Sequence, residues 1–230
     1  MNWPDDFINK VICGDCLEVM KEMPDECVDS CFADPPFNVG LDYKKFDDRK
    51  PGEEYWNWIE VRIREIFRVL KDNSRFYIFH TDIGIFNLRP ICEKVGFRYH
   101  QQLIWYRPNL TGGTKITKDW HIVFENILLF HKGKRTAMKN SRWARNCFAI
   151  LTYPSPQRNF SGGRDHPAQK PLGLMKHLIG RTPGKTIIFP FLGSGTDTRA
   201  AKDLKRNFIG IEINPDYCKI AEERLAQGVL

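Results

Sequence analysis

Short apolar runs alternate with longer amphipathic stretches along most of this chain. In the stretch 53–70, apolar residues such as Ile59, Ile63 and Ile66 recur at three- and four-residue steps, and this spacing predicts a helix. Shorter helices are predicted over 171–179, 196–205 and 215–226. Apolar runs typical of buried strands occur at 10–13, 28–33, 75–80, 98–106, 121–131, 185–190 and 207–211. This alternation predicts an α/β fold with a doubly wound, mostly parallel sheet.

The two longest strand-like runs, 98–106 and 121–131, have no helix between them. A polar loop that contains Gly112 and Gly113 joins them. Parallel neighbours need a long crossover connection, whereas antiparallel neighbours do not. The two runs are therefore predicted to pair in antiparallel fashion at one edge of the sheet.

The composition fits one globular domain with an inserted segment, because 42% of the 230 residues are hydrophobic. No apolar run reaches the ~18 residues of a membrane span, and no basic region leads into an apolar stretch at the N-terminus. These features predict a cytoplasmic protein without a membrane partner. The seven cysteines are scattered. Cys27 and Cys31 lie in or beside a predicted buried strand, which favours buried thiols over zinc, and no metal is predicted.

The positive charge of the chain is concentrated in one segment. The sequence has 35 Lys and Arg against 28 Asp and Glu, a net charge of +7. The segment 131–164 holds eight basic and no acidic residues, so the remainder has a net charge of −1. The eight are Lys132, Lys134, Arg135, Lys139, Arg142, Arg145, Arg158 and Arg164. Aromatic residues lie between them, which favours phosphate contact and base stacking over a solvated basic loop.

Asp34, Pro35, Pro36 and Phe37 form the most informative motif. They follow the apolar run 28–33, so a carboxylate and two prolines stand where a buried strand opens into a loop. Proline fixes φ and has no backbone N–H. The Asp34 side chain and the Pro35 carbonyl are thus acceptors beside an aromatic ring. The motif suits an amino group on a flat ring, and a strand-ending turn is the alternative.

A second unit, near the C-terminus, has the order of a cofactor site. A predicted strand leads into a glycine-rich turn, a helix, and another strand that ends in Glu212. The turn consists of Phe191, Leu192, Gly193, Ser194, Gly195 and Thr196. Glycines let a ligand approach the backbone, and an acid about 20 residues further on suits ribose hydroxyls.

The details of this unit disfavour phosphorylated ligands. The turn lacks the full G-x-G-x-x-G spacing, and no P-loop lysine follows it. A nucleoside without phosphates, such as S-adenosylmethionine, needs the ribose acid but no phosphate site. Asp15, at another predicted strand end, is in a position to accept a hydrogen bond from an adenine amino group.

Taken in order, these motifs resemble those of the amino-group DNA methyltransferases of the β arrangement, in which the catalytic motif precedes the cofactor motif. The similar stretches are 34–37, 68–71, 104–109, 125–130, 166–171, 191–196 and 210–212. The resemblance implies a circularly permuted class I methyltransferase sheet of seven strands, the seventh antiparallel. It divides the chain into a catalytic half, 1–130, a target-recognition segment, 131–164, and a cofactor half, 165–230.

The resemblance also implies the roles of individual residues. Asp34, Pro35, Pro36 and Phe37 would act on the reacting amine. S-adenosylmethionine would lie among Asp15, Asp34, Lys170, Phe191, Gly193, Ser194, Gly195, Thr196 and Glu212. One position departs from the family pattern, because Phe189 stands where an acid usually anchors the methionine end of the cofactor. We therefore expect Phe189→Asp to tighten cofactor binding or leave it unchanged.

The implied activity is methyl transfer to the N6 amino group of adenine in double-stranded DNA. An aspartate at the first motif position, Asp34 here, leans towards adenine and a serine towards cytosine, so N4-cytosine methylation is the nearest alternative. A DNA-binding protein that has lost catalysis is a second alternative, because of Phe189, and an RNA or protein amide substrate is a third. The resemblance leaves a homodimer and a cognate restriction endonuclease open as partners, and the target sequence is not readable from the chain.

Overall fold

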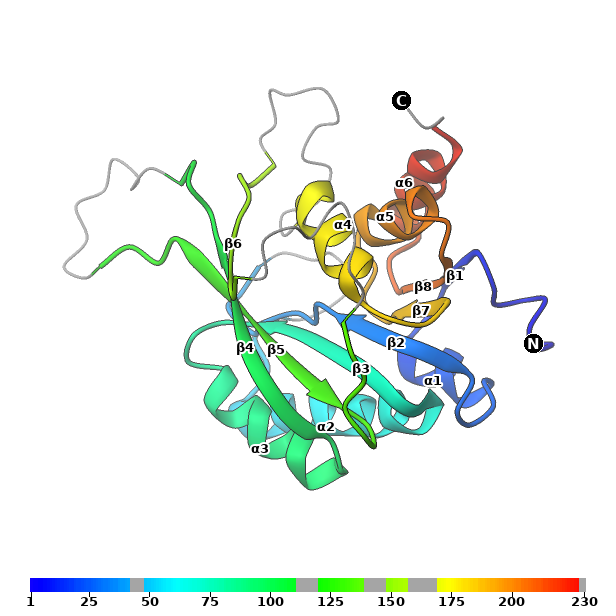
Figure 1. Cartoon of the computed structure of the whole chain (residues 1–230), viewed down its shortest axis with the longest axis horizontal. Helices are drawn as coiled ribbons and strands as arrows, with labels where there is room; N and C mark the ends of the chain where they lie inside the picture. Colours follow the sequence, from blue (N-terminus) through cyan, green and yellow to red (C-terminus); the bar gives the residue numbers. More distant parts are fainter. Residues whose placement is uncertain (42–47, 111–119, 139–147, 157–168, 228–230) are drawn as a thin grey trace.

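The computed structural model describes residues 1–41, 48–110, 120–138, 148–156 and 169–227. Within these residues the chain forms one eight-stranded sheet with helices on both faces (Figure 1). The strands are β1 (Lys10–Cys13), β2 (Val28–Ala33), β3 (Leu70–His80), β4 (Arg98–Tyr106), β5 (Phe124–His131), β6 (Ile150–Thr152), β7 (Thr186–Phe189) and β8 (Asn207–Glu212). Their order across the sheet is β1-β8-β7-β2-β3-β5-β4-β6.

Each face of the sheet has its own helical layer and its own apolar core. The helices α1 (Cys16–Lys21), α2 (Gly52–Val69) and α3 (Ile85–Val95) cover one face. The helices α4 (Leu172–Arg181), α5 (Thr196–Asp203) and α6 (Pro215–Ala226) cover the other. The amphipathic pattern of α2 explains its place, since Ile59, Ile63 and Ile66 are all buried in the first core.

The strand directions decide where functional groups meet. Among the described strands, β5 is antiparallel to both of its neighbours, β3 and β4, and every other pairing is parallel. The antiparallel pairing predicted for 98–106 and 121–131 is confirmed. The carboxyl ends of the parallel strands therefore meet the beginning of β5 at one edge, here called the carboxyl edge. The end of β5 lies at the opposite edge.

Four features of the fold differ from the prediction. The strand β6 is an eighth strand, and it lies outside β4, so the antiparallel pair is not outermost. It is only three residues long, too short for a periodic signal. The strand β3 begins at Leu70, directly after α2, and not at 75. The helices α1 and α3 were not predicted, because α1 has six residues and α3 contains Pro90 and buries few side chains.

The sequence also predicted that no segment spans a membrane. In the described ranges, no helix combines the length and the apolar character that a bilayer crossing requires.

Candidate active site

A pocket opens at the carboxyl edge, beside the ends of β1, β2, β7 and β8. It contains about 860 Å³ of space not filled by atoms, part of it open to solvent. Of the predicted cofactor residues, all except Gly195 line it. The lining residues used below are Asp15, Asp34, Pro36, Trp58, Arg62, Lys170, Gly193, Asp197 and Glu212. The fold therefore joins the two motifs, which lie far apart in the sequence, in one cavity.

Asp34 lies at the start of a chain of alternating charges. The Nζ atom of Lys170 is 2.7 Å from Asp34 Oδ2 and 3.0 Å from Glu125 Oε2. Arg107 Nη1 is 3.2 Å from the other oxygen of Glu125. Because β5 is antiparallel, Glu125 near its beginning reaches the edge where β2 ends. Asp34 Oδ1 is buried and has no hydrogen-bond partner among the described residues.

Asp34 and Lys170 form an ion pair that has little contact with solvent. Burial raises the pKa of Asp34 to about 6, Lys170 opposes this shift and Glu125 adds to it. Burial alone would lower the pKa of Lys170, but the carboxylates of Asp34 and Glu125 outweigh it and keep the pKa above its ordinary value. Lys170 is 4% exposed and stays an ammonium group. Asp34 is thus an acceptor whose charge depends on Lys170.

Tyr55 and His80 contact the Pro-Pro turn and the ring of Phe37 that follows it. Tyr55 Oη donates to the Pro36 carbonyl at 2.7 Å and lies 2.8 Å from His80 Nε2. His80 Nδ1 accepts from the amide of Thr81, which leaves the Nε2–H to donate to Tyr55. Burial lowers the pKa of His80 to about 4, so the ring is neutral. The ring of Phe37 stacks on this ring with centroids 5.0 Å apart, which fixes its orientation.

The glycine turn and Glu212 form the other wall of the pocket. Glu212 Oε2 accepts from the amide of Gly193 at 2.7 Å, and Oε1 accepts from the amide of Asn214 at 2.8 Å. Burial raises the pKa of this carboxyl, and these amides oppose the shift. Gly195 has φ of 80°, and a Cβ there would come within 2.7 Å of Ala221, so only glycine fits. Each carboxylate oxygen keeps a further lone pair for a ligand hydroxyl.

Asp15 and Arg62 form the adenine side of the predicted cofactor site. Asp15 caps α1, and its Oδ1 accepts from the amide of Leu17 at 2.7 Å. Its Oδ2 lies 2.6 Å from Arg62 Nη2, and the guanidinium group of Arg62 lies 4.0 Å from the centroid of the Trp58 ring. Arg62 therefore belongs to the pocket wall, and the sequence analysis did not single it out.

A further acid, Asp197, lines the pocket from the first turn of α5. It is 7% exposed, and burial raises its pKa to about 7, with the charge of Asp34 as the next cause. Phe189, in contrast, is fully buried in the apolar core on the α4–α5 face and stacks at 6.0 Å on Phe32. The burial of Phe189 speaks against the expectation that Phe189→Asp tightens cofactor binding or leaves it unchanged, because a charge at this position would lie in the core.

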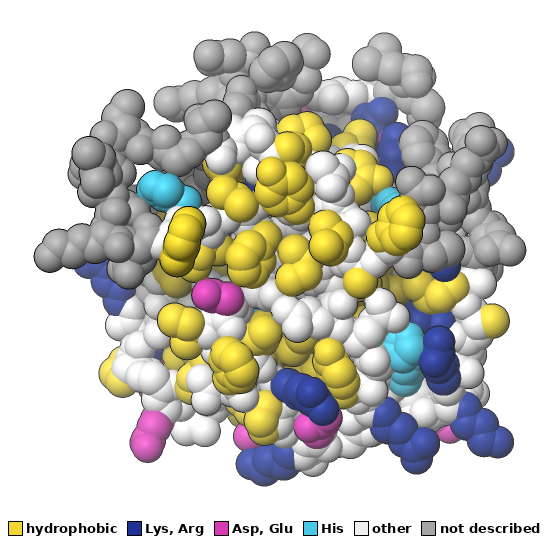
Figure 2. Space-filling model, turned by 60° about the vertical axis from the view of Figure 1, so that its left-hand side comes forward, with side chains coloured by type: hydrophobic (Ala, Val, Ile, Leu, Met, Phe, Trp, Pro, Cys, Tyr) yellow, Lys and Arg dark blue, Asp and Glu magenta, His cyan; other side chains and the backbone are white. Residues whose placement is uncertain are grey.

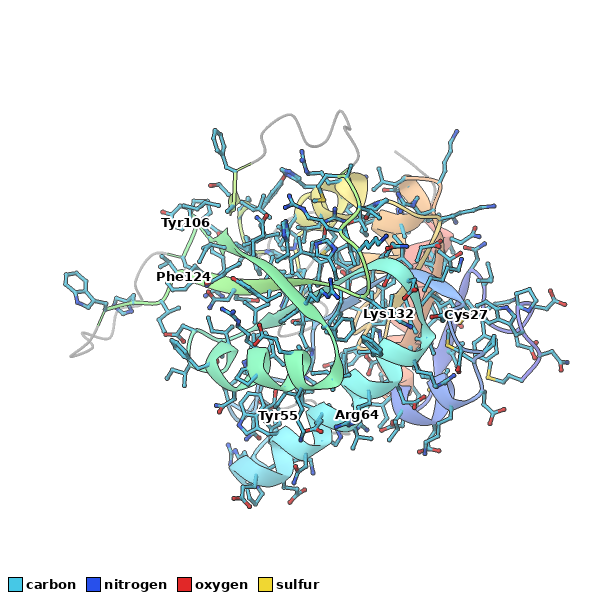
Figure 3. All side chains as sticks on the ribbon, turned by 60° about the horizontal axis from the view of Figure 1, so that its bottom comes forward. Cys27, Tyr55, Arg64, Tyr106, Phe124 and Lys132 are labelled. Atoms are coloured by element: carbon cyan, nitrogen blue, oxygen red, sulfur yellow. The ribbon has the colours of Figure 1, made fainter. Side chains whose placement is uncertain are left out.

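Three of the basic residues predicted to bind DNA, Lys132, Lys134 and Arg135, lie in the described part of the chain, and none of these three lines the pocket. Lys132 is buried, and its Nζ contacts Glu26 and the carbonyls of Phe67 and Leu70. It lies at the end of β5, while the Tyr106–Phe124 pair lies at the other end of the sheet (Figure 3). Three acceptors hold its ammonium group, so a phosphate contact by Lys132 is contradicted.

The other predicted nucleic-acid residues fall into two groups. Lys134 and Arg135 are exposed but follow β5 at the same far edge as Lys132. Lys139, Arg142, Arg145, Arg158 and Arg164 lie outside the described residues. The antiparallel direction of β5 explains the place of the first group, because it carries the chain away from the carboxyl edge before the basic segment begins. A DNA contact by Lys134 or Arg135 stays a prediction.

Sequence analysis missed two acids of the site, Glu125 and Asp197, for different reasons. Glu125 belongs to the stretch 125–130 that carried part of the family resemblance, so a signal existed, but its contact with Lys170 depends on the strand order. Asp197 directly follows the glycine turn, and an acid in the first turn of a helix also occurs for reasons of helix stability alone. Only the pocket distinguishes the two roles.

The cysteines do not assemble a metal site in the described part of the chain, where no group of three or more His, Cys, Asp and Glu residues could hold an ion. Cys16 and Cys31 are buried, and burial raises the pKa of both thiols, that of Cys16 to about 12. These two are protonated core residues.

The fold and this pocket are those of a class I methyltransferase. The family model described as DNA methylase, which covers N6 and N4 amino methyltransferases, matches residues 28–223. The chain belongs to this family and is an S-adenosylmethionine-dependent DNA methyltransferase. The names of its relatives connect the family with type II restriction-modification systems.

Two relatives and two solved structures show the extent of the similarity. The type II methyltransferase M.HpaI of Haemophilus parainfluenzae is 30% identical over 94% of this chain and 74% of its own. The DNA adenine methyltransferase YhdJ of Escherichia coli (strain K12) is 28% identical over 94% of this chain and 82% of its own. The M1.HpyAVI–SAM complex has a TM-score of 0.73 at 26% identity and covers 94% of this chain and 99% of its own. The cytosine-N4-specific PvuII DNA methyltransferase has a TM-score of 0.80 at 20% identity, over 96% of this chain and 87% of its own, and shows the fold alone.

Proposed function

We propose that this DNA methyltransferase acts on the N6 amino group of adenine in double-stranded DNA. The observation that carries the proposal is the Asp34 carboxylate, whose Oδ2 is held by Lys170 and whose buried Oδ1 has no partner in the described residues. An acceptor held in this way suits an N–H of a planar base. The adenine specificity named for the relative YhdJ, and the aspartate at the first motif position, support adenine over cytosine.

The chemistry proposed for the site begins with the amine. Its lone pair is delocalised into the base, so it is a weak nucleophile. Asp34 Oδ1 and the Pro35 carbonyl accept the two N–H groups, which draws the nitrogen towards tetrahedral geometry and frees the lone pair. The cofactor supplies an electrophilic methyl group when it is bound. Because Lys170 already holds Asp34 in place, most of the rate gain is expected from positioning and electrostatics.

The proton balance also involves Asp34. Formation of the new N–C bond would break the bond between the methyl carbon and the sulfonium sulfur, with the neutral thioether as the leaving group. The base nitrogen would then carry the positive charge and give up a proton. A carboxylate with a pKa of about 6 can take this proton and pass it to solvent near neutral pH. The base must first leave the duplex, at a cost of a few kcal/mol. Phe37, whose ring is backed by His80, is the proposed stacking partner of the base.

The DNA-binding face proposed here is the carboxyl edge around the ends of β4 and β6 and the beginning of β5. Figure 2 shows hydrophobic side chains gathered on this side of the molecule. The exposed hydrophobic residues of the segments that lead into and out of these strands are Tyr106, Trp120, Ile122, Phe148 and Ile150, and Trp120 is 98% exposed. Exposed aromatic side chains beside the active site can stack on the base that loses its pairing partner when the target nucleotide is flipped out.

The basic residues that remain candidates for phosphate contact include Arg158 and Arg164. They lie outside the described residues, but β6 before them and Lys170 after them both lie at the carboxyl edge. We expect the double variant Arg158→Ala and Arg164→Ala to reduce the slope of log affinity against log salt by about two. The matched control is Lys134→Ala with Arg135→Ala, which removes the same charge at the far edge and leaves the slope unchanged.

N4-cytosine methylation is the alternative that shares every contact at Asp34, because cytosine also presents an exocyclic amine. The likeness to the cytosine-specific PvuII enzyme is at 20% identity and speaks for the fold only. A protein that has lost catalysis is disfavoured, because Asp34, Lys170 and Glu212 line one pocket. A homodimer and a restriction partner stay expectations of the family resemblance.

The test is direct identification of the modified base. DNA from cells that express the protein is digested to nucleosides and analysed by mass spectrometry, with cells that express Asp34→Ala as the control. N6-methyladenine that is present only with the wild-type chain supports the proposal. N4-methylcytosine in its place overturns the adenine assignment, and the absence of both bases, with a folded protein, overturns catalysis.

A further inference from the structure

Asp197 is the acid of the pocket that the site described so far does not use. It lies in the first turn of α5, directly after the glycine turn, and its side chain lines the same cavity as Asp34 and Glu212. It is 7% exposed. Within the described part of the chain, no hydrogen bond or ion pair involves its carboxylate. A buried carboxylate without a partner costs free energy, so a ligand group is the natural candidate for its partner.

The other three acids of the pocket are already engaged. Glu212 accepts from two backbone amides. Asp15 accepts from a backbone amide and from Arg62. Asp34 is paired with Lys170. Asp197 is therefore the carboxylate that is left over for a cation brought in by a ligand.

The charges around Asp197 agree with a missing cation. Asp34 acts on it as a like charge, and Lys170 and Arg224 act as opposite charges at longer reach. Lys170 is shared between Asp34 and Glu125, and Arg224 Nη1 donates to the carbonyl of Ser194 and to Thr196 Oγ1. Both cations are thus committed elsewhere. Burial and these charges together raise the pKa of Asp197 to about 7.

We propose that Asp197 binds the ammonium group at the methionine end of S-adenosylmethionine. The cofactor brings two positive groups, the ammonium and the sulfonium. The sulfonium must face the amine that Asp34 accepts, whereas the ammonium needs a carboxylate of its own. The end of β7 cannot provide one, because Phe189 points into the apolar core. The first turn of α5 begins beyond the glycine turn that follows β7, so this chain supplies the acid from the helix.

The experiment compares three ligands that differ in their positive groups. S-adenosylmethionine has both charges, S-adenosylhomocysteine keeps the ammonium only, and 5′-methylthioadenosine has neither. Calorimetry measures each affinity for the wild-type chain, Asp197→Asn and Asp197→Ala. We expect both substitutions to weaken S-adenosylmethionine and S-adenosylhomocysteine about 10- to 100-fold, as for loss of a charged hydrogen bond. The affinity for 5′-methylthioadenosine should stay within about twofold of wild type.

The matched control is Asp203→Asn, on the same helix. The side chain of Asp203 is also little exposed, at 6%, but it pairs with Lys176 and Arg199 and does not line the pocket. Asp203→Asn should leave the affinities for all three ligands unchanged, even if the thermal midpoint of this variant falls. Binding of 5′-methylthioadenosine shows in addition that each variant has a folded pocket.

Three results would overturn the proposal. Equal weakening of all three ligands would mean that Asp197 only shapes the turn. Weakening of S-adenosylmethionine alone would assign Asp197 to the sulfonium. Unchanged affinity for S-adenosylhomocysteine would exclude the contact. No DNA is present in these measurements, so their outcome is independent of whether adenine or cytosine is the methylated base.

Discussion

Asn in place of Asp34 is the sharpest test of the reacting centre, because it keeps the size of the side chain and removes its charge. In the wild-type chain Oδ2 is 2.7 Å from Lys170 Nζ, and Oδ1 is the buried acceptor for the amine. An amide has one acceptor atom and one donor group. Either Lys170 or the amine of the base would therefore face an NH₂ group.

The size of the effect follows from these two contacts. A hydrogen bond to a charged group contributes about 1.5–3 kcal/mol. Asp34→Asn loses one such bond and weakens the other, so transition-state stabilisation should fall by roughly 3–5 kcal/mol, which is about a 10²- to 10⁴-fold loss of rate. Glu125 still holds Lys170 at 3.0 Å, and the fold should persist.

The assay is single-turnover transfer of a labelled methyl group to DNA, with cofactor affinity and thermal midpoint measured on the same samples. Asp25→Asn is the control, since Asp25 pairs with Arg68 on the surface and lies outside the pocket. A rate for Asp34→Asn within tenfold of wild type, in a protein that folds and binds the cofactor, would refute the role given to this carboxylate.

Three further predictions concern neighbouring residues. The methylation rate should fall below a pH of about 6, because the pKa of Asp34 in the folded protein is raised to that value and protonation removes the acceptor. Lys170→Met removes a charge that lowers this pKa. The acid limb of its single-turnover pH profile should therefore lie at higher pH than that of the wild type. Glu212→Ala should weaken the cofactor by about 1.5–3 kcal/mol by calorimetry, and an unchanged affinity would contradict the ribose contact. Phe189→Asp should lower the free energy of unfolding by about 3–5 kcal/mol in denaturant titrations, against about 1 kcal/mol for Phe189→Leu, and similar values for both would contradict the core packing.

The sequence by itself determined the class of fold and the two halves of the site. Periodicity predicted α2 and the alternation of strands and helices, because these depend on local repetition of apolar residues. The antiparallel pair was predicted from the absence of a crossover helix between its two strands. The motif at Asp34 and the turn at Gly193 could be identified because proline and glycine restrict or widen the backbone conformation at their own positions. Such features need no knowledge of which strand lies beside which.

Only the tertiary structure decided which charges face one another. Asp34, Glu125 and Lys170 are distant in sequence, and they meet because β5 runs against its neighbours. The same reversal removes Lys132 from the DNA-binding candidates, since it carries the end of β5 to the far edge. Whether Asp197 caps a helix or faces a ligand likewise depends on the cavity beside it. Partners that lie across a sheet are set by strand order and direction, and neither is written in the local pattern of residues.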